Sequence, residues 1–230
     1  MRALESSENK DQILKKQCLA FFGTITASLS HELNNAMAII NEHNGLLDDM
    51  LLGFRQGVPL DDKKLTRISQ KITAQVDRGR EIIRRLNKFA HSTDSPVTEI
   101  EVSELLQAII NLAQRLAGLK GLVIEFKTNA EPLNLSTNPF FLQQAVFIGF
   151  ELFMANPDAN RLIAVSAAAS DGEIAIKITG TAVSEGESLK AGTDLLAILM
   201  EQLNGQYEIV TESDGKRTIV LTLKGLRSLG

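Results

Sequence analysis

Apolar residues recur at steps of three and four through residues 12–52, which is the spacing of one face of an α-helix. No proline interrupts this stretch, and it ends at the segment GFRQGVPLDD, where two glycines and a proline break the pattern. Residues 62–90 repeat the pattern, and Asp61 or Asp62 can cap this second helix. Because the connection is short, we expect an antiparallel helical hairpin. The two apolar stripes consist of Cys18, Phe22, Ile25, Leu29, Leu33, Ala36 and Ile40, and of Leu65, Ile68, Ile72, Val76, Ile83, Leu86 and Phe89.

A two-helix hairpin with one wide apolar face cannot bury that face by itself. We therefore expect a homodimer in which two hairpins form a four-helix bundle. The alternative is that the hairpin packs on the second half of the same chain. The homodimer is favoured because helices of ~30–40 residues extend beyond any small domain.

After the segment HSTDSPV, whose composition is typical of a linker, the apolar spacing changes. Short runs with strand character alternate with helical stretches near residues 103–119, 139–155 and 191–204. Two connections, DGE and SDGK, resemble hairpin turns, so the sheet should be mostly antiparallel. The predicted fold class is α+β, with a helical hairpin domain over residues 1–92 followed by an α/β sandwich domain over residues 98–230.

The composition, with 44% hydrophobic and 23% charged residues, is that of an ordinary globular protein. No apolar run approaches the ~20 residues of a membrane helix, and the first ten residues lack the apolar stretch of a signal peptide. We therefore expect a cytoplasmic protein without membrane contact. The net charge is −4, and we expect no nucleic-acid partner because dense basic residues are confined to one short stretch. That stretch contains Arg78, Arg80, Arg84, Arg85 and Lys88.

The segment SLSHELNNAM contains the strongest candidate for chemistry, His31. On a helix it lies roughly 160–180° from the apolar stripe, so its imidazole should face solvent. Ser28 and Asn35 lie about one turn away on the same face, and Glu32 lies about 100° around the helix. A neutral imidazole is a good nucleophile toward phosphorus. Glu32 could then fix its tautomer through the other ring nitrogen, and Asn35 could orient phosphoryl oxygens or a water.

Two other kinds of site fit this segment poorly. The zinc-binding pattern HExxH is incomplete, because position 35 is asparagine rather than histidine. Acyl transfer lacks a G-x-S-x-G segment, and Cys18 belongs to the apolar stripe. We therefore expect no metal site, and phosphoryl transfer remains the chemistry that gives each of His31, Glu32 and Asn35 a role.

The same residues resemble the H-box of two-component histidine kinases, in which the phosphoacceptor histidine is followed by an acidic residue and, four positions on, by Asn or Thr. The resemblance extends over nearly the whole chain, since the dimerisation hairpin of that family also precedes a nucleotide-binding α/β domain. It implies that His31 is the phosphoacceptor, Glu32 its acid/base neighbour and Asn35 the residue linked to dephosphorylation. The proline that usually follows is Ala36 here.

The second half resembles the kinase ATP-binding domain in outline but departs from its N-box. The segment TNPFFLQQAVFIGFELF is similar to the stretch that leads into this box. The two asparagine positions are then occupied by Ile148 and Leu152 or, in a shifted register, by Glu151 and Ala155. In either register, the asparagine that would hold magnesium is absent.

The glycine-containing boxes depart as well. Thr179 stands where the family has its adenine-binding aspartate. Gly192 remains from the glycine box, but Asp194 and Leu196 replace the other glycines, and the segment between the two boxes is too short for an ATP lid. Side chains at these positions hinder the approach of phosphates to the backbone, so ATP binding is not expected.

A kinase-like architecture without the ATP-binding residues resembles the dimeric histidine phosphotransferases of bacterial phosphorelays. The resemblance leads to the hypothesis of a dimeric histidine phosphotransferase, which carries a phosphoryl group on His31 between receiver-domain aspartates without ATP. Its expected partners are response-regulator receiver domains and a second copy of the chain. It would have no cofactor of its own, because the receiver domain would supply Mg²⁺. One alternative is an ATP-dependent sensor histidine kinase core. A second is a non-catalytic, pseudokinase-like module that docks a response regulator.

Overall fold

The structure is a computed structural model, and it describes residues 2–127, 131–155, 161–170, 172–181, 186–213 and 216–224. The chain divides into two compact units. One unit comprises Thr26–Phe89 and is called the hairpin unit here. The other comprises Met1–Ile25 together with Ala90–Gly230 and is called the α/β unit. Each is described by itself.

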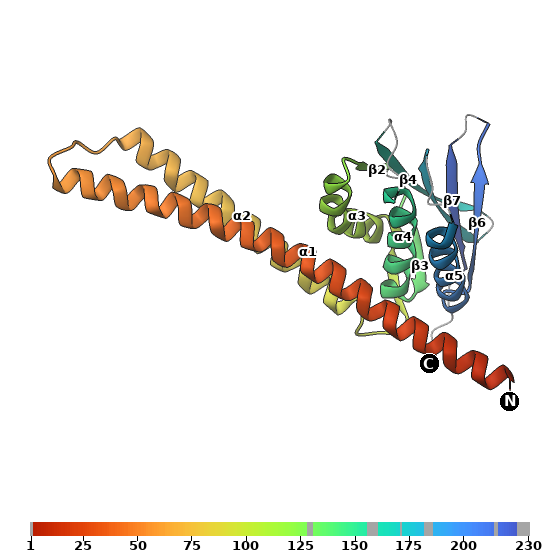
Figure 1. Ribbon diagram of the computed structural model, residues 1–230. Coiled ribbons are helices and arrows are strands. Elements are labelled where there is room, and N and C mark those ends of the chain that lie inside the picture. The colour runs from red at the N-terminus through yellow and green to blue at the C-terminus, as the bar shows by residue number, and fades with distance from the viewer. Residues whose placement is uncertain are drawn as a thin grey trace. The chain divides into compact units, whose positions relative to one another are not determined.

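The hairpin unit consists of two antiparallel helical segments, drawn in orange and yellow in Figure 1. They belong to α1 (Arg2–Arg55) and α2 (Asp62–His91), as the apolar spacing predicts. Asp61 caps α2, because its Oδ1 accepts a hydrogen bond from the backbone N–H of Lys64 at 3.0 Å. Between the helices the backbone bends through the predicted glycine-containing turn, where Gly57 has a positive φ of 90°.

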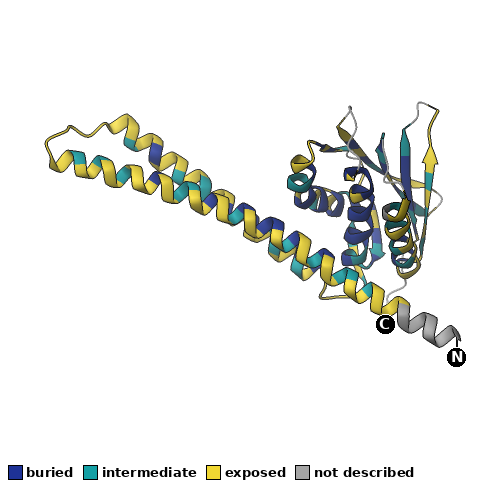
Figure 2. Ribbon diagram, viewed as in Figure 1, coloured by how far each residue is buried: buried dark blue, intermediate teal, exposed yellow. Residues whose placement is uncertain are grey.

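Only part of each predicted stripe is buried in the hairpin unit (Figure 2). The buried apolar side chains are Leu29, Ala36, Ile68, Ile82 and Phe89. The prediction is wrong at Ile83, which is 47% exposed, because the α2 stripe continues through its neighbour Ile82. Gly79 is also buried, and a Cβ there would lie 3.5 Å from Leu33 Cδ1, so the two helices approach closely at this level.

The α/β unit contains the predicted, mostly antiparallel sheet. Its five strands are arranged in the order β2-β4-β5-β7-β6, in which β2 and β4 are parallel and the other neighbours antiparallel. A separate antiparallel pair is formed by β1 and β3. The strands are β1 (Thr98–Glu101), β2 (Val123–Lys127), β3 (Asn134–Thr137), β4 (Leu162–Ser170), β5 (Glu173–Gly180), β6 (Gly205–Thr211) and β7 (Arg217–Leu223).

The strands that flank the segments DGE and SDGK, where turns are predicted, form the antiparallel pairs β4–β5 and β6–β7. Residues 171, 214 and 215 within these turns lie outside the described residues.

Three helices pack on one face of the five-stranded sheet (Figure 1), namely α3 (Val102–Leu119), α4 (Pro139–Met154) and α5 (Gly186–Gln202). The buried residues of β5 alternate as Ile174, Ile176 and Ile178, which is the period of a strand with one covered face. A Cβ on Gly149 of α4 would collide with Ile178, so this helix lies directly against the sheet.

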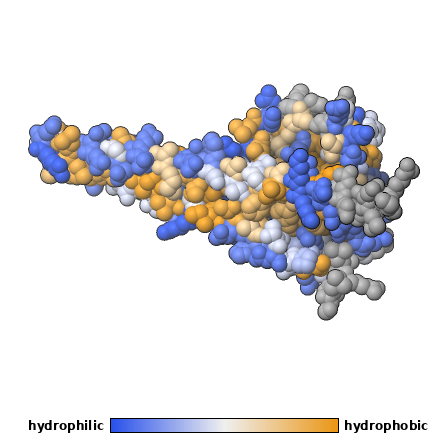
Figure 3. Space-filling model, turned by 60° about the horizontal axis from the view of Figure 1, so that its bottom comes forward, coloured by the Kyte–Doolittle hydropathy of each residue, from blue (hydrophilic) through white to orange (hydrophobic). Residues whose placement is uncertain are grey.

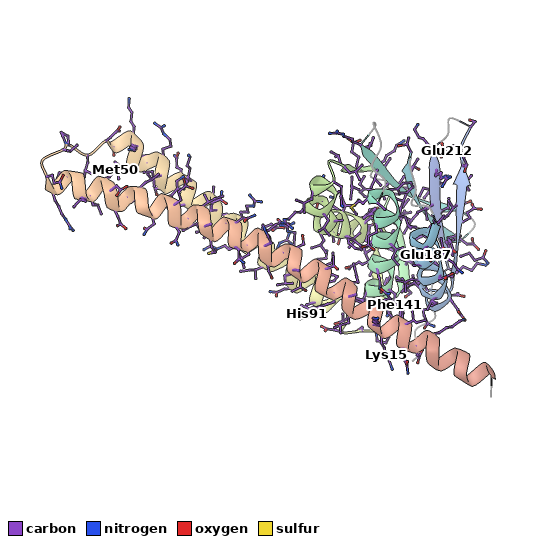
Figure 4. The ribbon with its side chains drawn as sticks, in the orientation of Figure 1. Lys15, Met50, His91, Phe141, Glu187 and Glu212 are labelled. Carbon is purple, nitrogen blue, oxygen red and sulfur yellow. The ribbon has the colours of Figure 1, made fainter. Side chains whose placement is uncertain are left out.

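The first part of α1 belongs to the α/β unit and packs on α4. The Phe21 ring lies 5.4 Å from the Phe140 ring and 5.2 Å from the Phe147 ring, measured between centroids. Cys18 donates a hydrogen bond to Gln144 Oε1 at 3.3 Å, and burial raises the pKa of its thiol. Beside them an apolar hollow of about 470 Å³ includes Lys15 and Phe141, both labelled in Figure 4.

None of the helices in the described ranges combines the length and apolar character needed to cross a membrane. Nor do the described His, Cys, Asp and Glu residues gather into a group of three that could hold a metal ion.

Candidate functional site

His31 lies in the α1 segment of the hairpin unit with its side chain exposed, on the side that helical phase predicts. One turn further on, Asn35 is also exposed, and its Nδ2 atom lies 3.2 Å from His31 Nδ1. The predicted neighbours His31 and Asn35 are therefore in contact. Nε2 lies on the edge of the ring remote from Nδ1 and from its contact with Asn35.

Glu32 is directed elsewhere than expected. Its side chain is 11% exposed, and its Oε2 atom lies 3.4 Å from Nη2 of Arg85 on α2, whose side chain is 20% exposed. The expectation that Glu32 holds the other ring nitrogen of His31 therefore does not describe this structure. Helix geometry is the reason, since adjacent residues point about 100° apart and Glu32 falls between the two helices.

Ser28 differs from its expected position on the face of His31. The residue is 3% exposed, and its Oγ has no hydrogen-bond partner within the described part of the chain. Ser28 and Glu32 are one turn apart, so a buried polar strip follows α1 beside the exposed histidine.

Arg85 was missed as a site residue by sequence reasoning. The sequence feature that could have identified Arg85 is its position in the basic stretch of α2, next to Leu86 of the apolar stripe. The neighbouring Arg84 remains on the surface, where it forms a two-point ion pair with Glu81 at 2.8 and 2.9 Å. Only the rotation of α2 about its axis distinguishes the inward arginine from the outward one.

The residues at the expected nucleotide boxes are distributed over α4, β5 and α5 of the α/β unit. Ile148 and Leu152 are buried in the core of α4. Thr179 Oγ1 lies 2.9 Å from Thr218 Oγ1 on the neighbouring strand. On α5, Leu196 is fully buried and Asp194 is exposed. Residues 182–185, in the connection between the boxes, lie outside the described residues.

A cavity of about 280 Å³ lies between α4 and α5, with part of its wall contributed by the first section of α1. Glu151 is the carboxylate among its described lining residues, and burial raises the pKa of this group. Gly192 also lines the cavity, and a Cβ there would lie 2.8 Å from Leu152 Cδ2. The close packing of α5 on α4 therefore explains this glycine without a ligand. The lining residues are Gln17, Ile148, Glu151, Leu152, Ala191, Gly192 and Leu195.

Known proteins resemble this chain in fold but not in sequence. No protein family model matches the chain, and no curated protein matches it in sequence. Among solved structures, the catalytic domain of the histidine kinase ThkA is 14% identical, with a TM-score of 0.50 over 58% of this chain and all of that domain. The α/β unit has the fold of a histidine kinase catalytic domain.

Two further neighbours carry similar descriptions. The histidine kinase AdeS of Acinetobacter baumannii is 12% identical over 86% of this chain and 98% of its own, with a TM-score of 0.49. The ATP-binding domain of PrrB from Mycobacterium tuberculosis is 18% identical over 58% of this chain and all of that domain, with the same TM-score.

These findings correct the first hypothesis drawn from the sequence, a phosphotransferase that works without ATP. The α/β unit has the fold of the ThkA domain, which is a histidine kinase catalytic domain, and this fold favours the alternative of a sensor histidine kinase core. Altered residues at the nucleotide boxes led the sequence interpretation away from this alternative, although the backbone fold that carries those boxes is present.

Proposed function

We propose that this chain is the core of a two-component histidine kinase, in which the α/β unit binds ATP and His31 accepts its γ-phosphoryl group. The observation that carries the proposal is the kinase catalytic fold of the α/β unit in a chain that also presents an exposed histidine on a helical hairpin. Phosphoryl transfer depends mainly on positioning and charge stabilisation, so one exposed imidazole on a regular helix is a sufficient acceptor.

The donor site of this proposal is the cavity between α4 and α5. Mg²⁺ at nucleotide sites is commonly held by one or two carboxylates together with substrate phosphates, and Glu151 is a carboxylate that meets this requirement. A bound Mg²⁺ would neutralise phosphate charge. The loss of the adenine acceptor at Thr179 should weaken ATP binding by about 1–3 kcal/mol relative to an intact aspartate, because a polar group is left without its partner.

Glu32 and Asn35 complete the proposed acceptor site. We assign Glu32 the role of acid/base neighbour, which requires its carboxylate to leave Arg85 and turn toward the ring. We assign Asn35 a role in dephosphorylation, supported by its contact with the imidazole. Both assignments follow the resemblance of SHELNN to the kinase H-box.

The partners we propose are a second copy of the chain and response-regulator receiver domains, which would take the phosphoryl group from His31. The support for a homodimer is the apolar surface along the hairpin unit (Figure 3). Its exposed large apolar side chains are Met37, Leu46, Leu51, Leu52, Phe54, Val58, Leu60 and Ile83.

Light scattering at micromolar concentration should give the mass of a dimer. Replacing Met37 with Glu places a charge on this apolar surface and should shift the mass toward a monomer. Replacing the exposed Asn41 with Glu is the matched control and should leave the dimer intact. A wild-type chain that remains monomeric would contradict the proposed assembly.

Labelling with γ-labelled ATP and Mg²⁺ tests the donor assignment. We expect wild-type protein to acquire a label that is acid-labile and alkali-stable, as a phosphoramidate is. Glu151→Gln should lower the initial rate because it removes the proposed Mg²⁺ ligand, whereas Glu208→Gln, an exposed position on β6, should not. Absence of label at millimolar ATP would overturn the kinase proposal.

A further inference from the structure

We propose that Asn35 selects the tautomer of His31 and thereby decides whether Nε2, the ring nitrogen remote from Asn35, can act as a nucleophile. This inference rests on the proposed function for the reaction that follows. Its structural part concerns two side chains one helical turn apart and can be tested without any phosphoryl donor.

The direction of the hydrogen bond between the two side chains is linked to the tautomer of His31. The atom of Asn35 that lies 3.2 Å from His31 Nδ1 is Nδ2, and an amide nitrogen only donates. Nδ1 therefore accepts, and a neutral imidazole in this arrangement carries its proton on Nε2. Nε2 then has no lone pair to offer to phosphorus.

The other two histidines of the chain provide a contrast. His43 Nδ1 lies 2.8 Å from the carbonyl oxygen of Ile39, and His91 Nδ1 lies 2.7 Å from Asp94 Oδ2. Both oxygens face Nδ1 as acceptors, so each Nδ1 carries a proton and each Nε2 is unprotonated when the ring is neutral. His31 is the one whose partner, a side-chain amide, can either donate or accept.

Half a turn of the Asn35 amide exchanges Nδ2 for Oδ1 at the same position. Oδ1 accepts a hydrogen bond from Nδ1–H, so the ring proton moves from Nε2 to Nδ1 through solvent, and Nε2 gains a lone pair. Both side chains are exposed, so no packing opposes this rotation. The arrangement in the structure is that of the Nε2–H tautomer, and the rotated one is nucleophilic.

In the transfer step the Nε2 lone pair forms a bond to the γ-phosphorus of ATP. The bond between this phosphorus and the β–γ bridging oxygen breaks, and ADP leaves with that electron pair. The imidazole is then positively charged, and the Nδ1 proton, held by Asn35 Oδ1, passes to the carboxylate of Glu32, the proposed acid/base neighbour, and from there to water. Asn35 touches only the ring in this sequence, which makes it a positioning residue.

Nitrogen NMR of protein labelled with ¹⁵N-histidine tests the tautomer directly. The spectra are recorded about two pH units above the ordinary histidine pKa of ~6.5, where imidazoles are neutral. We expect wild-type His31 to show the pattern of an Nε2–H ring, and His43 and His91 the pattern of Nδ1–H rings. Asn35→Asp supplies only acceptor oxygens, so His31 should change to the Nδ1–H pattern, whereas Asn41→Asp on the same helix should not change it.

Reaction with phosphoramidate, a small phosphoryl donor that needs no nucleotide site, tests the consequence for nucleophilicity. It is carried out in ~1 M salt, where the added charge at position 35 is screened beyond about 3 Å. We expect Asn35→Asp to be labelled at His31 Nε2 several-fold faster than Asn41→Asp. Equal rates, an Nδ1–H pattern in wild-type His31, or an unchanged pattern in Asn35→Asp would each overturn the proposal. Failure of ATP labelling alone would instead count against the proposed function.

Discussion

The two units of the chain differ in how completely each buries its own apolar side chains. Helix α4 of the α/β unit has 13 buried residues among 16, whereas α2 has four among 30. The α/β unit covers α4 with a sheet and neighbouring helices, while the hairpin segments leave large apolar side chains exposed. The comparison indicates that the α/β unit carries its own core and that the hairpin unit depends on a further surface, which we propose to be a second hairpin.

The largest expected effect separates the two units by stability. Phe150 is fully buried in α4, and Phe150→Ala should lower the free energy of unfolding of the α/β unit by about 3–5 kcal/mol through the cavity it leaves. Tyr207, the single tyrosine, lies in β6 and donates a hydrogen bond to the Thr193 carbonyl, so its fluorescence reports on this unit. The denaturation midpoint measured by Tyr207 fluorescence should shift much more in Phe150→Ala than in Met37→Ala. Equal shifts would contradict the distinction between the units.

The next effect concerns the Glu32–Arg85 pair of the hairpin unit. Arg85→Ala leaves a largely buried carboxylate without its ion-pair partner and should destabilise the hairpin by about 2–4 kcal/mol, somewhat below a fully buried pair. Arg84→Ala is the matched control, because its ion pair with Glu81 is exposed and screened by solvent and should contribute far less to stability. Circular dichroism, dominated by the long helices, measures both variants. The interpretation fails if Arg84→Ala is the more harmful change.

The smallest expected effect is a pH-dependent change in stability that is confined to the α/β unit and depends on Glu101. Burial alone would raise the pKa of Glu101, but its carboxylate accepts hydrogen bonds from the backbone N–H groups of Leu133, Ser103 and Glu104, and the pKa is lowered. Its contribution is therefore present above the unfolded pKa of ~4.3 and is lost as the pH falls toward the lower folded pKa.

Glu101→Gln should reduce the stability of the α/β unit by about 1 kcal/mol at neutral pH, because it weakens an N-cap of α3. The difference from wild type should shrink as the pH falls below ~4. Tyr207 fluorescence during urea unfolding at several pH values measures this. A difference that stays constant down to low pH would contradict the assigned role of the carboxylate.

The sequence predicts much of the fold because apolar periodicity is a local property. The hairpin and the mostly antiparallel sheet follow from it, and the contact of His31 with Asn35 lies within one helical turn. The pairing of Glu32 with Arg85 joins residues far apart in the chain and depends on the rotation of two helices, which periodicity determines only to within one position, as Ile82 and Ile83 illustrate.

The nucleotide boxes illustrate a different limit. Individual residues such as Thr179 and Asp194 differ from the kinase pattern, and on that basis the sequence favoured a function without ATP. The backbone fold depends on the apolar core residues of α4 and the sheet, so the α/β unit has the fold of a kinase catalytic domain although its box residues differ from the kinase pattern. The core residues therefore indicate the fold, whereas the box residues indicate how well the fold can bind a nucleotide.

The central claim is that His31 on the hairpin unit receives a phosphoryl group from ATP, and comparison of single-histidine variants in Mg²⁺-ATP labelling tests it most directly. His31→Ala should abolish the acid-labile label and leave the unfolding transition nearly unchanged, because the side chain is exposed. His91→Ala, a matched exposed histidine, should be labelled as wild type. The account is contradicted if His31→Ala is labelled as well as wild type or if His91→Ala loses the label.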